Sequence, residues 1–283
     1  MTIAYLNGEW LAPVEARVSV FDRGFMFGDA VYEVMAVYDG KIFLLEAHLG
    51  RLKRSLEEIR LDSPFNDTQW TTLLLEAIDR SGETEGYLYM QVTRGVEASR
   101  SHVYSGQSEP TVLITMTPAP ERALITPLRV VTKPDYRWQR ADIKVTSLIA
   151  NGMIKNEALA EGYDEAILVR DGFVTEATSA NVFVVREEVI LTPPLSNQLL
   201  HGVTRNHVVE LSREAGFTVE EKAIPESELL TAEEAWISST GNELRPVVEI
   251  NGSPVGDGSP GIICQQLDKL FQASKRRGQR CTD

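Results

Sequence analysis

The sequence predicts an α+β protein of two domains, a small N-terminal domain and a larger, strand-rich C-terminal domain. The chain has 283 residues, of which 43% are hydrophobic and 24% are charged, which is enough for two hydrophobic cores. Helical periodicity and β-rich runs are mixed in the first part, whereas strands dominate the second. Between them lies "PAPERALITP" at 118–127, with three prolines in ten residues. We therefore expect domains at 1–118 and 127–283, joined by a linker at 119–126.

The predicted N-terminal domain contains a mostly antiparallel sheet and two helices. "AVYEVMAVYDGKIFLL" predicts a hairpin around Asp39-Gly40, a strong turn signal. In the next segment, leucines recur at helical spacing on one stripe, so a helix is expected there and a second one at 67–80. The other expected strands are at 3–10, 17–21, "GYLYMQVTRG" and "PTVLITMTP".

The predicted C-terminal domain has many short strands and few helices. Helical spacing predicts one helix around Lys155, another from about Thr204 to Ala215, and a terminal one at about 261–274. The expected strands are at 127–133, 164–170, 173–176, 180–186, 189–192, 217–222, 234–239 and 246–250.

Charge and composition exclude several functional classes. The net charge is −13, so the basic surface that binds nucleic acid is not expected. No apolar run approaches the roughly 20 residues that cross a bilayer, and the N-terminus does not resemble a signal peptide. Cys264 and Cys281 lack metal-binding spacing, so we expect free thiols, no metal site and a cytoplasmic protein.

Lys155 attracts attention because of the neighbours that a helix would give it. At 100° per residue its side faces away from Glu157 and Glu161. The residues on the Lys155 side are Leu148, Asn151, Gly152, Ala158 and Leu159. Such a lysine either extends its amine along an apolar face to water, or is a desolvated amine poised to form a Schiff base.

Three later segments supply chemistry that favours the second interpretation. Glu176 ends a short strand before a run of small polar residues. Gly202-Val203-Thr204 opens a helix, whose first N–H groups can bind a phosphate. Ser239-Thr240-Gly241 ends a strand with hydroxyls and flexible backbone, a pattern that suits anions. An amine, a carboxylate and a phosphate site are together what pyridoxal 5′-phosphate needs.

These segments, in this order, resemble the class IV aminotransferases, which are fold-type IV pyridoxal-phosphate enzymes. Within that family the chain is most similar to bacterial D-amino acid aminotransferases. The similarity runs nearly end to end. Its most specific pieces are "DRGFMFGDAVYEV", "HLGRL", "YMQVTRG", "IKNEALAEGYDEAIL", "VTEATSANVF", "LLHGVTR" and "SSTGNELRPVVEI".

The resemblance implies a role for each matching residue. Lys155 matches the lysine that bonds to the cofactor aldehyde, and Glu176 matches the partner of the pyridine nitrogen. Arg51 in "HLGRL" matches the arginine that binds the phosphate, and Leu200 packs against the ring. The remaining phosphate-binding positions are Val203, Thr204, Ser239 and Thr240.

The resemblance also implies how the substrate carboxylate is bound. A tyrosine, an arginine and a histidine form this trap in D-amino acid aminotransferases, and they match Tyr32, Arg100 and His102. Phenol, guanidinium and imidazole can each donate a hydrogen bond to a carboxylate. The loop between Arg94 and Arg100 is one residue longer than usual in the family, which leaves the position of Arg100 and the substrate range open. Each side chain has a structural alternative, a half-buried tyrosine and a solvated Arg/His pair.

The resemblance implies a ping-pong transfer of the amino group from a D-amino acid to 2-oxoglutarate or pyruvate. It further implies a homodimer in which the 100–104 loop approaches the subunit interface. The (R)-selective amine transaminases, the branched-chain L-amino acid aminotransferases and aminodeoxychorismate lyase are alternatives of the same fold. A Schiff-base lyase without pyridoxal phosphate and an inactive cofactor-binding scaffold are alternatives of another class.

Overall fold

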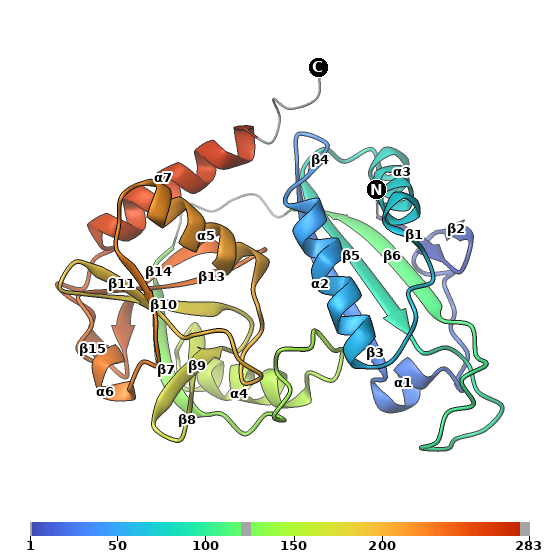
Figure 1. Cartoon of the computed structure of the whole chain (residues 1–283), viewed down its shortest axis with the longest axis horizontal. Coiled ribbons are helices and arrows are strands. Elements are labelled where there is room, and N and C mark those ends of the chain that lie inside the picture. The colour runs from blue at the N-terminus through green and yellow to red at the C-terminus, as the bar shows by residue number, and fades with distance from the viewer. Residues whose placement is uncertain (1, 120–125, 278–283) are drawn as a thin grey trace. The chain divides into compact units, whose positions relative to one another are not determined.

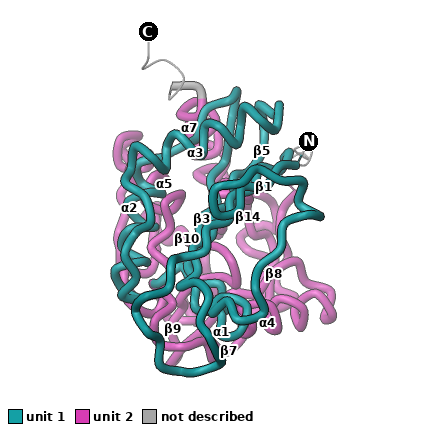
Figure 2. The backbone as a smooth tube through the Cα atoms, turned by 90° about the vertical axis from the view of Figure 1, so that its right-hand side faces the viewer, with its two compact units in different colours: residues 1–121, 143–147 teal, residues 122–142, 148–283 magenta. Residues whose placement is uncertain are grey.

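The computed structural model describes residues 2–119 and 126–277. By their contacts, residues 1–121 with 143–147 form one compact unit, and residues 122–142 with 148–283 form another (Figure 2). The predicted boundaries differ from these units in one respect, since they assign 143–147 to the C-terminal domain. The predicted linker at 119–126 lies mostly outside the described residues.

The first unit is an antiparallel sheet with helices on one face (Figure 1). The strand order is β2-β1-β6-β5-β3-β4. The strands are β1 (Ile3–Leu6), β2 (Glu9–Leu11), β3 (Ala30–Tyr38), β4 (Lys41–Ile42), β5 (Gly86–Thr93) and β6 (Thr111–Pro118). Helix α2 (Leu45–Glu58) packs on β3, and α3 (Asp67–Ser81) packs on β6 and β1. This arrangement confirms the α+β fold class and the antiparallel first sheet.

Alternation along β3 separates a core face from an open face. Val31, Met35 and Val37 point into the core that the helices cover, whereas Tyr32 and Val34 on the other face are only partly buried. Period-2 alternation produces this because successive strand residues point to opposite faces. Tyr32 therefore lies on the partly exposed face of this sheet.

The segment before β3 differs from the prediction. Residues 17–21 form no strand, and the side chains of Val18 and Val20 are exposed rather than buried against a core. Instead a short helix that the sequence does not predict, α1 (Arg23–Phe27), follows them. Its N-cap is Asp22, whose side chain accepts a hydrogen bond from the Gly24 N–H, as N-cap residues commonly do.

The second unit is built on one mixed sheet. The strand order is β12-β11-β10-β13-β14-β7-β8-β9, with β15 paired to β14. The strands are β7 (Leu128–Pro134), β8 (Glu165–Arg170), β9 (Phe173–Ala177), β10 (Asn181–Arg186), β11 (Val189–Thr192), β12 (Val219–Glu221), β13 (Glu234–Ser239), β14 (Glu243–Ile250) and β15 (Ser253–Pro254). The helices are α4 (Ile149–Ala160), α5 (Val203–Glu214), α6 (Glu226–Leu229) and α7 (Ile262–Arg277). The sheet has its own apolar core, so the second unit is the strand-rich one that the sequence predicts.

Residues 143–147 run beside the start of β3. Val145 forms an antiparallel bridge with Val31, and the Tyr32 N–H donates to the Lys144 carbonyl at 3.0 Å. The Thr146 N–H donates to the Ala30 carbonyl at 3.1 Å. Ile143 and Val145 join the apolar core of the first unit. Lys144 is thereby fixed next to Tyr32, although more than a hundred positions separate them in the chain.

Within the part of the chain that the structure describes, no helix combines the length and the apolar character that crossing a membrane requires.

Candidate active site

Arg51 lies in a buried cluster of the first unit with Glu33 and His48. Arg51 Nε and Nη2 lie 2.7 and 2.8 Å from the two oxygens of Glu33, a bidentate pair. His48 Nδ1 lies 2.8 Å from Glu33 Oε2. Helix α2 carries Arg51 and His48 on its inner face, and β3 supplies the carboxylate. The pair fixes the plane of the Arg51 guanidinium.

The electrostatics of this cluster keep Glu33 ionised. Burial raises the pKa of Glu33, but the charge and hydrogen bonds of Arg51, with help from His48, outweigh it and hold the pKa at about 2. Burial lowers the pKa of His48, and the charges of Arg51 and Lys144 lower it further against the pull of Glu33. Lys144 is therefore close enough to this cluster for its charge to act on it.

Lys144 and Tyr89 both lie against Tyr32. Lys144 Nζ lies 4.1 Å from the centroid of the Tyr32 ring, a cation–π contact. The Tyr32 and Tyr89 rings stack with centroids 5.7 Å apart. Burial, followed by the neighbouring Tyr32, raises the pKa of Tyr89 to about 12. An amine and two phenols are thus close together, and the charge of the same amine also acts on His48 in the Arg51 cluster.

The structure contradicts the premise that singles out Lys155 in the sequence. The side of α4 that it shares with Leu148 and Leu159 faces solvent, since these leucines are 40% and 51% exposed. Lys155 Nζ lies 2.9 Å from Glu165 Oε2 and donates to the Asp164 carbonyl at 2.5 Å, and its side chain is 33% exposed. The amine is therefore not enclosed by the apolar residues expected around it, because Leu148 and Leu159 are exposed, although Ala158 is buried.

Glu176 lies in the interior of the second unit in contact with Arg137. Arg137 Nη1 is 2.5 Å from Glu176 Oε1, and the same guanidinium pairs with Asp135 at 2.9 Å. Burial raises the pKa of Glu176 above its ordinary value; Arg137 and the Leu200 N–H offset this only in part, and the negative charge of Asp135 raises the pKa further. Glu176 Oε2 accepts a hydrogen bond from the Leu200 N–H at 3.1 Å.

Asn181 connects Glu176 to the start of helix α5. Its side-chain amide donates to Glu176 Oε2 at 3.4 Å and to the Leu200 carbonyl at 2.9 Å. A Cβ on Gly202, the N-cap residue of α5, would collide with Asn181 Oδ1. Only glycine therefore fits at this position. Among the described residues, no side chain caps the first N–H groups of α5, those of Val203 and Thr204.

Ser239 is the last residue of β13 and Thr240 follows it; β13 pairs with β10, whose first residue is Asn181. The Ser239 hydroxyl accepts a hydrogen bond from the Asn242 N–H at 3.1 Å, so it closes the turn to β14. The register places Ser238 opposite Asn181. In the second unit, Glu176, Leu200 and the start of α5 therefore lie around Asn181. Ser239 is the next residue after Ser238, the strand partner of Asn181.

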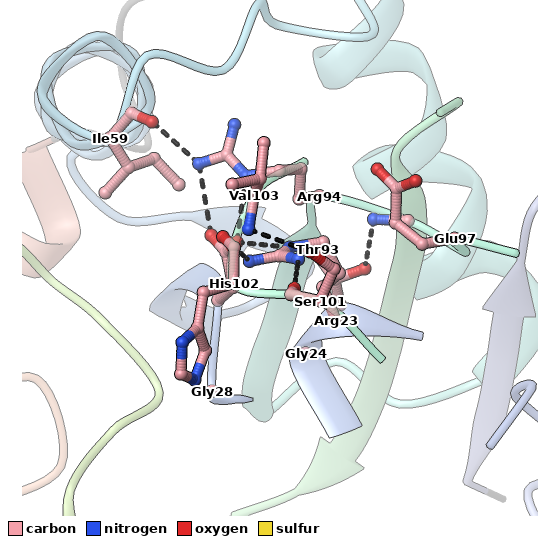
Figure 3. A network of polar contacts seen from close by, with 12 residues as sticks. Arg23, Gly24, Gly28, Ile59, Thr93, Arg94, Glu97, Ser101, His102 and Val103 are labelled. Atoms are coloured by element: carbon pink, nitrogen blue, oxygen red, sulfur yellow. Dashed lines mark hydrogen bonds and ion pairs between the residues drawn. The ribbon is translucent and has the colours of Figure 1, made fainter. Parts of the chain in front are cut away.

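Arg100 and His102 lie in an exposed loop of the first unit and share the ring of Phe27. The Arg100 guanidinium carbon lies 5.0 Å from that ring centroid, and the His102 ring lies edge-on at 5.6 Å. Figure 3 shows the backbone of this loop hydrogen-bonded to Arg23. The two predicted carboxylate-binding groups are thus close to each other.

Sequence reasoning misses four side chains that contact the candidate site residues in the structure: Lys144, Glu33, Arg137 and Asn181. Asn181 has a local signal, because it is a polar residue at the start of the otherwise apolar strand "NVFVVR". Glu33 has one as well, as a carboxylate on the core face of β3. Lys144 has none, because its neighbours come from distant segments.

The chain belongs to the family described as class IV amino-transferases, whose sequence model matches residues 30–250. These enzymes use pyridoxal phosphate, and this chain is a pyridoxal-phosphate-dependent aminotransferase with the fold of that family. The resemblance seen in the sequence is thereby confirmed.

The relatives of known activity narrow the comparison. The chain is 41% identical over 270 residues to a D-alanine aminotransferase of Bacillus licheniformis, and 95% of each chain is covered. Two solved branched-chain aminotransferases share the fold. That of Thermoproteus uzoniensis with norvaline has a TM-score of 0.87 and 28% identity, covering 95% of this chain and 93% of the other. Another, complexed with N-(5′-phosphopyridoxyl)-L-glutamate, has a TM-score of 0.87 and 25% identity, covering 95% and 92%.

The residues of the second unit fit this cofactor. A buried carboxylate suits a protonated ring nitrogen, and Glu176 presents one oxygen to the Leu200 N–H and the Asn181 amide. An uncapped helix start at a position that admits only glycine suits a phosphate, and Gly202 provides it.

We expect the buried Glu33 carboxylate to make stability acid-sensitive. Its pKa in the folded protein is about 2, against an ordinary 4.5, so its contribution is complete above about pH 4.5 and is lost as the pH falls toward 2. The gap in unfolding free energy between wild type and Glu33→Gln should therefore narrow by about 3 kcal/mol over that range. Urea unfolding at a series of pH values measures it. Glu57→Gln, an exposed change on α2, should show no such narrowing. A constant gap for Glu33→Gln would contradict the assignment.

Proposed function

We propose that this enzyme transfers the amino group of a D-amino acid such as D-alanine or D-glutamate to a 2-oxo acid such as pyruvate or 2-oxoglutarate. The observation that supports the proposal is the arrangement around Asn181, which gathers a buried carboxylate, Glu176, with Leu200 and the start of α5, groups suited to the ring and the phosphate of pyridoxal phosphate. The preference for D-amino acids is supported by the activity of the 41% identical relative.

We propose that Lys144, rather than Lys155, bonds to the cofactor aldehyde. Lys155 Nζ is already engaged by the Glu165 carboxylate and the Asp164 carbonyl oxygen. Lys144 lies against Tyr32, and its charge reaches the cluster that contains Arg51. This support is independent of the helical pattern that favours Lys155 in the sequence.

The remaining residues then take the following roles. Arg51 would contribute to binding the phosphate, assisted by Val203, Thr204 and the Ser239-Thr240 turn. Glu176 holds the ring nitrogen protonated, and Leu200 packs on the ring. Bound pyridoxal phosphate supplies an aldehyde for the substrate amine and a ring that accepts electrons when the Cα proton leaves. Lys144 Nζ would accept that proton as a general base.

The substrate carboxylate is bound, in this proposal, by Arg100, His102 and Tyr32. A guanidinium gives two parallel hydrogen bonds to a carboxylate, and the imidazole and phenol add one each. Amines that lack a carboxylate gain nothing from these groups, which is why we favour amino acids over simple amines.

A spectral half-reaction tests the function directly. The yellow holoenzyme should lose its visible absorbance and release pyruvate when D-alanine is added without an acceptor. L-Leucine and (R)-1-phenylethylamine should react at least about 100-fold more slowly. L-Leucine has the opposite handedness to D-alanine, and the amine has no carboxylate for the proposed contacts. Faster reaction with L-leucine would favour the branched-chain alternative, and faster reaction with the amine would favour the amine transaminases. A protein that stays colourless with added cofactor would contradict the proposal as a whole.

Two lysine variants test the assignment of the cofactor lysine. Lys144→Ala should bind the cofactor without the absorbance of a lysine adduct and lose turnover by at least about 10³-fold, because the covalent bond and the general base disappear together. Lys155→Ala should retain the absorbance and stay within about threefold of wild-type turnover. Near-normal turnover in Lys144→Ala, together with loss of turnover in Lys155→Ala, would instead support Lys155 as the cofactor lysine, which is the role that the family resemblance implies for it.

We further propose that the enzyme is a homodimer in which loop 100–104 completes the site of the partner subunit. Exposed apolar side chains near this loop support it, among them Phe25 and Val103. The support for a cytoplasmic location is the sparse use of cysteine.

Mixing two inactive variants tests the shared site. Lys144→Ala and Arg100→Ala should each be weak alone. After subunit exchange, hybrid dimers contain one site with both groups intact, so about a quarter of wild-type activity should return. Mixtures that stay as weak as their components would place both groups in the site of a single subunit, and light scattering gives the mass of the assembly independently.

A further inference from the structure

We propose that the short helix α1, through Arg23 and Phe27, positions loop 100–104 so that Arg100 and His102 are held ready for the substrate carboxylate. This inference rests on the proposed function, which assigns that carboxylate to those two side chains. It gives a role to "DRGFMFGD", residues 22–29, a segment to which the proposed function assigns none.

Helix α1 is held in place at both ends. Asp22 is buried, accepts a hydrogen bond from the Gly24 N–H at 2.7 Å and receives the hydroxyls of Thr93 and Thr111 at 3.0 and 2.7 Å. These threonines end β5 and begin β6, so the helix start is tied to two strands. At its other end Gly28 has a φ of 65°, and a Cβ there would collide with Ser147 Oγ. Helix α1 therefore has a fixed position, from which the side chains of Arg23 and Phe27 extend.

Arg23 connects helix α1 to the backbone of loop 100–104. Its Nη1 donates to the Ser101 carbonyl at 2.6 Å, and its Nη2 donates to the His102 carbonyl at 3.3 Å (Figure 3). One planar guanidinium thus holds two consecutive carbonyls, and the side chain is buried although the loop is exposed. A lysine would keep the charge but lacks the fork that reaches both carbonyls at fixed geometry.

Asp29 orients this guanidinium and a second one. Arg23 Nε lies 2.8 Å from Asp29 Oδ2, while Arg94 contacts both Asp29 oxygens at 2.9 and 3.1 Å. Burial raises the pKa of Asp29, but its hydrogen bonds and charge contacts with Arg94 and Arg23 outweigh this and lower the pKa. Arg94 also donates to the Ile59 carbonyl at 2.7 Å and lies 4.1 Å from the ring centroid of Tyr104. The loop is therefore contacted at residues 101, 102 and 104.

Phe27 acts on the side chains rather than on the backbone. Its ring is contacted by the Arg100 guanidinium at 5.0 Å, by the His102 ring at 5.6 Å and by Arg23 at 4.8 Å. Exposed arginine side chains ordinarily lose rotamer freedom when they bind a ligand. A shared aromatic ring restricts Arg100 and His102 beforehand, so less affinity for the carboxylate is lost on binding. Arg23 and Phe27 are positioning residues, which act through the two groups that meet the substrate.

The test compares substrates with and without a carboxylate. In Arg23→Met, the KM for D-alanine should rise about tenfold while kcat stays within about threefold, because only the orientation of the loop is lost. The KM for D-alaninamide, which has no carboxylate, should not change. Arg23→Lys should behave like Arg23→Met, and Phe27→Leu should raise the KM for D-alanine alone. Arg17→Met, a change at an exposed arginine whose side chain contacts only nearby carbonyls, is the matched control and should match wild type.

Hydrogen exchange supplies a readout that does not depend on activity. The amides of residues 100–104 should exchange at least about tenfold faster in Arg23→Met than in wild type or Arg17→Met, because two carbonyl contacts are lost. Arg23→Met should still fold, since Asp29 keeps its bidentate partner Arg94, and thermal unfolding checks this.

Two outcomes overturn the inference: unchanged KM with unchanged exchange in loop 100–104, or an equal loss with D-alanine and D-alaninamide, which would mark Arg23 as a general structural residue. Failure of the proposed function looks different. Wild type would then not transaminate D-alanine at all, and unchanged exchange in Arg23→Met would still count against the inference separately.

Discussion

A charge can lie in a protein interior only beside an opposite charge, and the functional groups of both units depend on that requirement. Removing one partner of a buried ion pair costs about 3–5 kcal/mol, which is a large part of the stability of a domain. Arg51 is held in this way by Glu33, and Glu176 by Arg137. The same pairs that stabilise the interior also fix the planes of the groups proposed to bind the cofactor. Stability and orientation therefore cannot be varied separately at these positions.

The groups proposed to meet the substrate are held by weaker forces. Arg100 and His102 are exposed and lie against an aromatic ring, and their loop backbone is fixed by a guanidinium that is itself buried. A carboxylate partner for Arg100 inside the chain would compete with the substrate carboxylate. An aromatic partner restricts the arginine without neutralising it, so its charge remains for the ligand. Buried ion pairs thus hold the groups proposed to bind the cofactor, which stay in place through a catalytic cycle. Weaker aromatic contacts hold the groups proposed to bind the substrate, which must release a product.

Local patterns predict most of the fold, and they fail where distant segments decide. The leucine stripe of α2 and the alternation along β3 are properties of neighbouring residues, so the sequence predicts both elements. Helix α1 has five residues, too few for periodicity to show. Glu176 stands out by its place at a strand end, and the family resemblance supplies its role. Lys155 stands out in a helical projection because the projection compares helix faces by apolar content. On α4, however, Leu148 and Leu159 on the Lys155 side are exposed. Lys144 owes its neighbourhood to a pairing with β3, which no window around residue 144 contains.

That pairing has a consequence for how the chain is made. The strand-like segment 143–147 belongs to the first unit, although residues 122–142 and everything after 147 belong to the second. During synthesis, residues 1–121 can leave the ribosome and collapse, but the start of β3 remains without this neighbour until residue 147 has emerged. The first unit therefore cannot mature before the second has begun, and a fragment cut after residue 121 would lack Lys144. Neither unit corresponds to a contiguous piece of the chain, so expressing them separately would divide the enzyme at the wrong place.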